Sequence, residues 1–113
     1  DMEWLGYFVG KNDFLEELHI EPFTPTSGAS VRDVMVPFLR GVNCNKSIQT
    51  ISFDGVNLLG GEMFTMLGSF LKNNHNLTKI DITYCDFGEE GSSLFALALG
   101  NCTHKSLRKV LLE

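Results

Sequence analysis

A pattern of three apolar residues with the spacing L-x-x-L-x-L returns four times along this chain, and it constrains the fold more than any other feature. The first copy is Leu15, Leu18 and Ile20. The later copies begin at Ile48, Leu77 and Leu107, so that successive copies lie 33, 29 and 30 residues apart. Self-similarity with a period of about 20 to 50 residues is typical of a solenoid, in which each repeat is one supersecondary unit.

A second match extends the periodicity to the beginning of the sequence. Residues 5–9 (Leu-Gly-Tyr-Phe-Val) and 67–71 (Leu-Gly-Ser-Phe-Leu) lie 62 residues apart, as do Asn12 and Asn74. Since 62 residues are two repeats of 31, residues 1–12 are expected to be the tail of an earlier repeat. We therefore expect one repeat segment over residues 1–113, an incomplete array with no polar capping repeat at either end. Its repeats are 13–45, 46–75 and 76–104, and a further repeat starts at 105–113.

Each repeat combines two periodicities. Around Ile80-Asp81-Ile82 the apolar residues alternate with polar ones, which predicts a short strand with one buried face. After a turn that contains glycine, the period lengthens to that of an amphipathic helix. The apolar stripes of the three expected helices are Val31, Val34, Met35, Phe38 and Leu39, then Met63, Met66, Leu67, Phe70 and Leu71, then Leu94, Leu97 and Ala98.

Two residues of the first helical segment bear on its extent. Ser30 stands directly before the stripe and is expected to cap the helix, because its hydroxyl can accept a hydrogen bond from a free backbone amide. Pro37 lies inside the segment and has no N–H to donate, so we expect a kink or a shortened helix there.

One strand and one helix of this size cannot bury both of their apolar faces alone. Stacked side by side, the strands form a parallel sheet with about 4.8 Å between neighbours, and the helices cover its back. Because helices are wider than strands, the stack is expected to curve with the sheet on the concave side and the helices on the convex side. The expected fold is thus an α/β solenoid of about three full repeats with partial repeats at both ends.

The third repeat resembles a known family. Residues 77–87 fit L-x-x-L-x-L-x-x-[NC]-x-L with Cys85 at the Asn/Cys position, and Gly88-Glu-Glu-Gly91 followed by Leu94 is similar to the G-x-x-G…L helix start of ribonuclease-inhibitor-type repeats. The chain therefore resembles leucine-rich-repeat proteins of the ribonuclease-inhibitor-like class over nearly its whole length. Departures occur where Phe23 and Val56 take the Asn/Cys position, and prolines at 22 and 25 predict an irregular turn. The resemblance implies a protein-binding scaffold, inhibitor or regulator without naming its partner.

Composition excludes some classes of function. The formal net charge of −5 argues against nucleic-acid binding, which needs clustered cations. No run of eighteen apolar residues is present, so we expect no membrane span. An odd number of cysteines without a CxxC pair favours a reducing compartment, so we expect an intracellular protein (cytoplasmic or organellar). Sequons begin at Asn45, Asn76 and Asn101, at what we take to be the same place in the repeat, and glycosylation stays open.

Motifs for catalysis or metal binding have little support. No nucleophile stands in a known catalytic pattern, and the glycine pairs lack the Gly-Lys-Ser/Thr of a phosphate loop. Four possible metal ligands fall in loops between a helix and a strand, but their spacing matches no zinc pattern; they are Cys44, His75, Cys102 and His104. We expect no enzyme activity, no metal and no cofactor, and we expect Cys85 to point inward as a small residue of its turn.

The concave face is the candidate functional surface. Because side chains alternate along a strand, the residues between and beside the apolar strand residues point away from the helices. For any one of them a solvated polar position is the alternative, but together they form a long, rigid surface suited to a protein partner. The candidate contact residues are Glu17, His19, Glu21, Ser52, Asp54, Lys79, Asp81, Thr83 and Lys109, with Thr50, Leu111 and Glu113 in the same rows.

Three functions fit this surface. The leading one is a non-catalytic recognition or scaffold module that binds a protein of unknown identity. One alternative is a regulator of an enzyme such as a small GTPase, because the Ran GTPase-activating protein uses the same type of repeat. No arginine matches a catalytic role, since Arg32 and Arg40 fall in a predicted helix and Arg108 lies beside a strand. The other alternative is a structural subunit of a large assembly that makes contacts through its convex helices.

Overall fold

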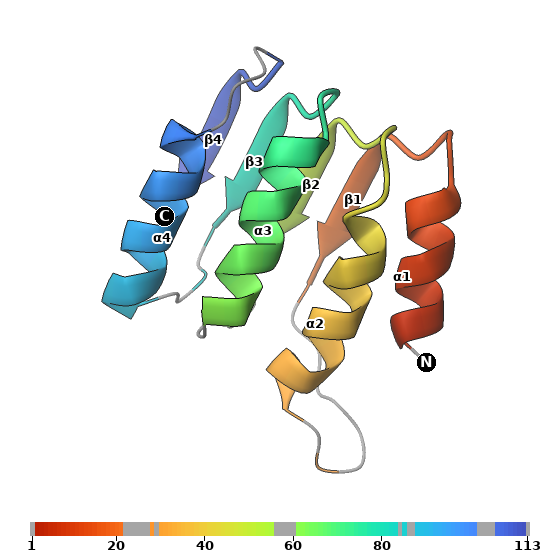
Figure 1. Cartoon of the computed structure of the whole chain (residues 1–113), viewed down its shortest axis with the longest axis horizontal. Coiled ribbons are helices and arrows are strands. Elements are labelled where there is room, and N and C mark those ends of the chain that lie inside the picture. The colour runs from red at the N-terminus through yellow and green to blue at the C-terminus, as the bar shows by residue number, and fades with distance from the viewer. Residues whose placement is uncertain are drawn as a thin grey trace.

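Helices and strands alternate along the chain in a computed structural model. The structure describes residues 2–21, 28, 30–55, 61–83, 85, 88–101 and 106–112. The side chains of Arg32, of residues 61–64 and of Leu112 are not described. The helices are α1 (Met2–Lys11), α2 (Val31–Val42), α3 (Gly61–Asn73) and α4 (Gly88–Gly100). The strands are β1 (Glu17–Ile20), β2 (Thr50–Phe53), β3 (Lys79–Ile82) and β4 (Lys109–Leu112). Figure 1 shows one row of helices lying over one face of a single sheet.

The strands of the described residues pair in chain order, β1-β2-β3-β4, and every pair is parallel. Glu17 pairs with Thr50, Thr50 with Lys79, and Lys79 with Lys109. These pairs reproduce the 33-, 29- and 30-residue spacings of the sequence pattern, so the predicted register is confirmed. The fold is the expected α/β leucine-rich-repeat solenoid, with the sheet on its concave side and the helices on its convex side.

The core lies between the sheet and the helices. The inward strand residues are fully buried in β2 and β3, where exposure alternates along each strand. Leu67, Phe70 and Leu71 of α3 pack into the same layer, as the predicted stripe requires. The side chain of Met63 lies outside the described residues, and so do the predicted irregular turn at 22–27 and the Asn/Cys position of the second repeat, Val56.

Helix α2 confirms the predicted cap at Ser30 and, of the two alternatives expected at Pro37, excludes the shortened helix. Ser30 caps the helix: its hydroxyl accepts from the Asp33 amide at 3.0 Å, and the Asp33 carboxylate accepts from the Ser30 amide at 3.3 Å. The helix is not shortened at Pro37 but continues to Val42. Burial of Met35, Phe38 and other apolar residues on both sides of the proline compensates for the missing backbone hydrogen bond.

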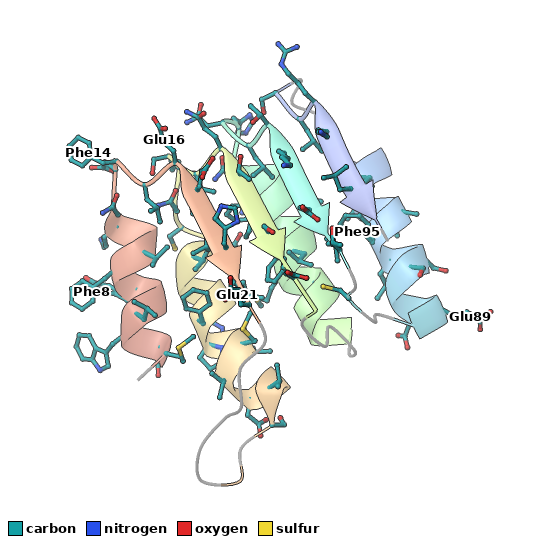
Figure 2. All side chains as sticks on the ribbon, turned by 180° about the vertical axis from the view of Figure 1, so that it is seen from behind. Phe8, Phe14, Glu16, Glu21, Glu89 and Phe95 are labelled. Atoms are coloured by element: carbon teal, nitrogen blue, oxygen red, sulfur yellow. The ribbon has the colours of Figure 1, made fainter. Side chains whose placement is uncertain are left out.

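The predicted stripe of α4 is wrong at one position. Leu97 is 63% exposed, whereas Phe95, which the stripe omitted, is 3% exposed. Since an α-helix turns by about 100° per residue, Leu97 points about 200° away from Phe95 around the helix axis. The bulkier Phe95 fills the space beside the sheet (Figure 2), with Gly91 buried one turn before it.

Candidate functional site

The face of the sheet that points away from the helices carries three rows of side chains. The first row is Glu17, Thr50, Lys79 and Lys109, and the second is His19, Ser52, Asp81 and Leu111. The third row lies directly after the strand ends and consists of Glu21, Asp54 and Thr83. There the Asp54 amide donates to the Ile20 carbonyl, and the Gly55 amide donates to the Thr83 carbonyl. All of these side chains that the structure describes are exposed or half-exposed. Figure 2 shows the face from the front, with Glu16 and Glu21 at the two ends of β1.

Charge is distributed unevenly over this concave face. In the first row the acidic Glu17 on β1 gives way to Lys79 and Lys109 on β3 and β4. The third row is acidic at Glu21 and Asp54. Neighbouring strands lie about 4.8 Å apart and residues of successive rows about 6.6 Å apart. The face therefore has a basic corner and an acidic corner, with Asp81 between them.

Among the described residues of the concave face, two contacts join side chains. The Nε2 of His19 lies 3.4 Å from an Oε2 of Glu17, and both side chains are more than half exposed. An exposed pair of this kind contributes little to stability. The Thr83 hydroxyl donates to the Asp81 carboxylate, which fixes the direction of that side chain. Most of the polar atoms on this face are thus accessible to a partner.

All nine candidate contact residues lie on or directly beyond the four strands, where the alternation predicted them. The structure brings them together in one surface, and Thr50 and Leu111 belong to the same rows. Glu113 lies outside the described residues. Their contact with a partner stays a prediction.

Sequence reasoning missed a ladder of asparagines in the loops before the strands. Asn45 and Asn74 are at most 1% exposed. The side-chain amide of Asn45 donates to the carbonyl oxygens of Val9 (2.7 Å) and Asn12 (2.9 Å), and that of Asn74 donates to the carbonyl of Asn45 (3.2 Å). Each asparagine also accepts backbone amides of its own loop with its Oδ1. The signal was present in the sequence, because Asn12, Asn45 and Asn74 repeat at the spacings of the strands.

This ladder corrects the expectation that the three sequons share one place in the repeat. Asn45 is the counterpart of Asn12 and Asn74, whereas Asn76 stands two residues later. The side-chain nitrogen of Asn45 is buried and donates twice, so it is not available for glycosylation in the folded protein. Asn76 and Asn101 are exposed.

Two of the three cysteines, Cys44 and Cys85, lie within the described residues. Cys85 is partly buried against the core, as predicted, and its thiol donates to the Phe53 carbonyl at 3.1 Å. Cys44 is exposed, and Cys102 and His104 lie outside the described residues. In the part of the chain that the structure describes, no three His, Cys, Asp or Glu side chains are grouped to hold a metal ion. Of the helices described, none combines the length and the apolar character that crossing a membrane would need.

Comparisons with known proteins support the fold. No protein-family model matches the chain, and a search of curated proteins finds no match. Among solved structures, the chain is similar to a tropomodulin C-terminal domain from Caenorhabditis elegans, with a TM-score of 0.58 and 12% sequence identity. The match covers 100% of this chain and 83% of that one. At this identity the likeness shows the fold alone.

These findings define the class of the protein and correct its assignment to a family. The fold is that of a leucine-rich-repeat solenoid. The assignment to the ribonuclease-inhibitor-like class is corrected, because the solved structure to which the chain is similar is a tropomodulin C-terminal domain. The departures at Phe23 and Val56 already marked where the repeats leave that motif.

Proposed function

We propose that this chain is a non-catalytic recognition module that binds a protein through its concave face. The observation that carries the proposal is the regular array of accessible polar side chains on a sheet whose other face is buried under the helices. Such an array holds its side chains at fixed spacings, so that a partner meets a surface that is already ordered. The partner loses little binding energy to ordering this surface.

The charges indicate the chemistry of the partner. The corner with Glu21 and Asp54 suits basic side chains, and the corner with Lys79 and Lys109 suits acidic ones. Complementary charges of this kind mainly steer and orient the encounter. A partner with both signs of charge, arranged along a diagonal of the sheet, fits this face best.

The same surface gives little support to catalysis. His19 is largely exposed and its hydrogen-bond partner is Glu17, which is largely exposed as well. A general base must be oriented by a neighbouring group and held within hydrogen-bond reach of the proton that it removes, in a site from which water can be excluded. The setting of His19 is that of a contact residue, and a protein without enzyme activity is what we propose.

Reversing three concave charges tests the proposal. In the triple variant Glu17→Lys, Asp54→Lys and Asp81→Lys, we expect the affinity for a protein captured from the source cells to fall about tenfold or more, because the steering charges are reversed. The circular dichroism spectrum and melting temperature should change little, since none of these side chains is buried. Affinity would be measured by surface plasmon resonance with the purified partner.

A control with the same change in net charge uses acidic residues outside the sheet. Asp13 lies in the loop after α1, and Glu89 and Glu90 lie in the first turn of α4, all exposed. The triple change of these residues to Lys should leave the affinity unchanged. If binding is lost from the control and kept in the concave variant, the proposal is wrong and contact through the convex side, as in a structural subunit, is favoured.

A further inference from the structure

Charge changes sign along one edge of the sheet, where the loops enter the strands. Corresponding segments of successive repeats are 12–17, 45–50 and 74–79, and the fourth segment is described over 106–109. Acids stand in the first segment and cations in the later ones: Asp13, Glu16 and Glu17, then Lys46, then Lys79, then Arg108 and Lys109. All of these side chains are exposed or half-exposed, and Figure 2 shows Glu16 at this edge. The edge is therefore negative at β1 and positive at β3 and β4.

Lys79 and Lys109, which we call the lysine pair, stand directly beside each other on neighbouring strands. Parallel strands lie about 4.8 Å apart, and like charges directly opposite each other destabilise a sheet. Asp81 follows Lys79 on the same face, but its carboxylate accepts a hydrogen bond from Thr83, two residues further from the lysines. The two ammonium groups therefore repel each other, and no ion pair among the described residues offsets that repulsion.

The lysine pair has the chemistry to hold a carboxylate. A carboxylate has two oxygens, so that one group placed between the lysines can accept hydrogen bonds from both of them. Such a contact replaces the repulsion between the two cations by two attractions. Arg108 directly precedes Lys109 and is exposed, so a second carboxylate can be bound next to the first.

We propose that the lysine pair binds an acidic segment of the protein partner, in which Asp or Glu side chains lie close together. The proposal rests on the recognition function of the concave face. Glu16 and Glu17 repel such a segment from β1, so that its acidic part lies over β3 and β4. Because the whole chain carries a formal charge of −5, the attraction is confined to this part of the edge.

The same surface is poorly suited to a nucleic acid, the other common polyanion. A phosphate backbone that extends past the lysine pair meets the acids at β1, and the net charge of the chain repels it. In the described rows of the concave face there is no Phe, Tyr or Trp on which a base could stack. A short acidic segment of a protein avoids both difficulties.

Fluorescence anisotropy with a labelled decapeptide of glutamate measures binding at the lysine pair, at an ionic strength of about 20 mM so that screening is weak. The wild-type protein should bind this peptide. Lys79→Gln and Lys109→Gln should each weaken binding about twofold to fivefold, and the double variant should weaken it more than either. The circular dichroism spectrum should not change, because neither lysine is buried.

Matched controls remove the same charge from the convex side. Arg40 of α2 and Lys72 of α3 are exposed, and Arg40→Gln with Lys72→Gln should leave the affinity for the peptide unchanged. A wild-type protein that does not bind the peptide overturns the proposal, and so does an equal loss in the controls. Tighter binding of a thymidine decamer than of the glutamate decapeptide also overturns it, since a nucleic acid would then be the preferred ligand.

The purified partner separates this proposal from the function on which it rests. The double variant Lys79→Gln and Lys109→Gln should lower the affinity for the partner as well as for the peptide. An unchanged affinity for the partner overturns the acidic segment as the ligand of the lysine pair. The reversal of Glu17, Asp54 and Asp81 then decides independently whether the concave face is the recognition surface.

Discussion

At the scale of single residues, the buried asparagines hold successive repeats together. Asn74 joins its own loop to the preceding one, because its Oδ1 accepts the Asn76 amide while its Nδ2 donates to the Asn45 carbonyl. Asparagine is suited to this place because one side chain offers both an acceptor and donors. Burial raises the free-energy cost of losing either hydrogen bond, because no water takes the place of the lost partner.

Replacing Asn74 by Ala should lower the free energy of unfolding by about 2 to 4 kcal/mol, because a buried and a partly buried backbone group lose their partner. The matched control is Asn73→Ala, one residue earlier and exposed at the end of α3, with an expected change below about 0.5 kcal/mol. Urea unfolding followed by circular dichroism measures both. Equal midpoints for the two variants would show that the ladder does not stabilise the array.

At the scale of elements, α1 and α2 approach each other along a seam of glycines. A β-carbon at Gly6 would lie 2.4 Å from the Phe38 carbonyl oxygen, and one at Gly41 would lie 2.3 Å from the Gly6 carbonyl carbon. Gly10 meets the Gly41 backbone in the same way. Because these contacts are with backbone rather than with flexible side chains, neither helix can yield locally.

We expect Gly41→Ala to destabilise the protein by about 1 to 3 kcal/mol, because the added methyl group forces the two helices apart. Gly100→Ala is the control: Gly100 lies in α4, and a β-carbon added there would have nothing within 4 Å. That change should be neutral or should stabilise by up to about 1 kcal/mol through helix propensity. Thermal melts of the two variants give the comparison, and a Gly41→Ala melt as high as that of the wild type would mean that the helices are not in such close contact.

Strand positions and register could be predicted from the sequence because each depends on local alternation and on a spacing that repeats. The nine candidate residues were placed on the concave face for the same reason. Side-chain exposure in α4 could not be predicted, since a stripe of three residues leaves the orientation of a helix uncertain and Phe95 competes with Leu97 for the core. Helix α1 has the same apolar pattern as α3, so the pattern alone does not distinguish its exposed residues from buried ones; only the position of the helix in the array does.

At the scale of the whole molecule, stability comes from stacking rather than from any one repeat. Ile80 on β3 is fully buried and packs in a core to which residues from several repeats contribute. Each repeat in such an array depends on its neighbours for burial of its apolar faces, so that damage in the middle should spread to both sides.

Ile80→Asp should unfold the protein, because it places an unpaired charge between sheet and helices at a cost of several kcal/mol, comparable with the whole stability of a small domain. Asp81→Ala, one residue further on and facing away from the helices, should barely change the melting temperature. A circular dichroism melt of each variant checks this. An unaltered melt for Ile80→Asp would contradict the strand register.

The glycine seam also determines how the array bends. The radius of curvature of such an array depends on how much farther apart its helices lie than its strands. Where Gly6 and Gly41 bring two helix backbones into contact, that difference is smaller than larger residues would allow, so we expect the array to bend less beside α1 and α2. A flat partner should therefore fit more closely against the end of the sheet at β1 than against the lysines of β3 and β4.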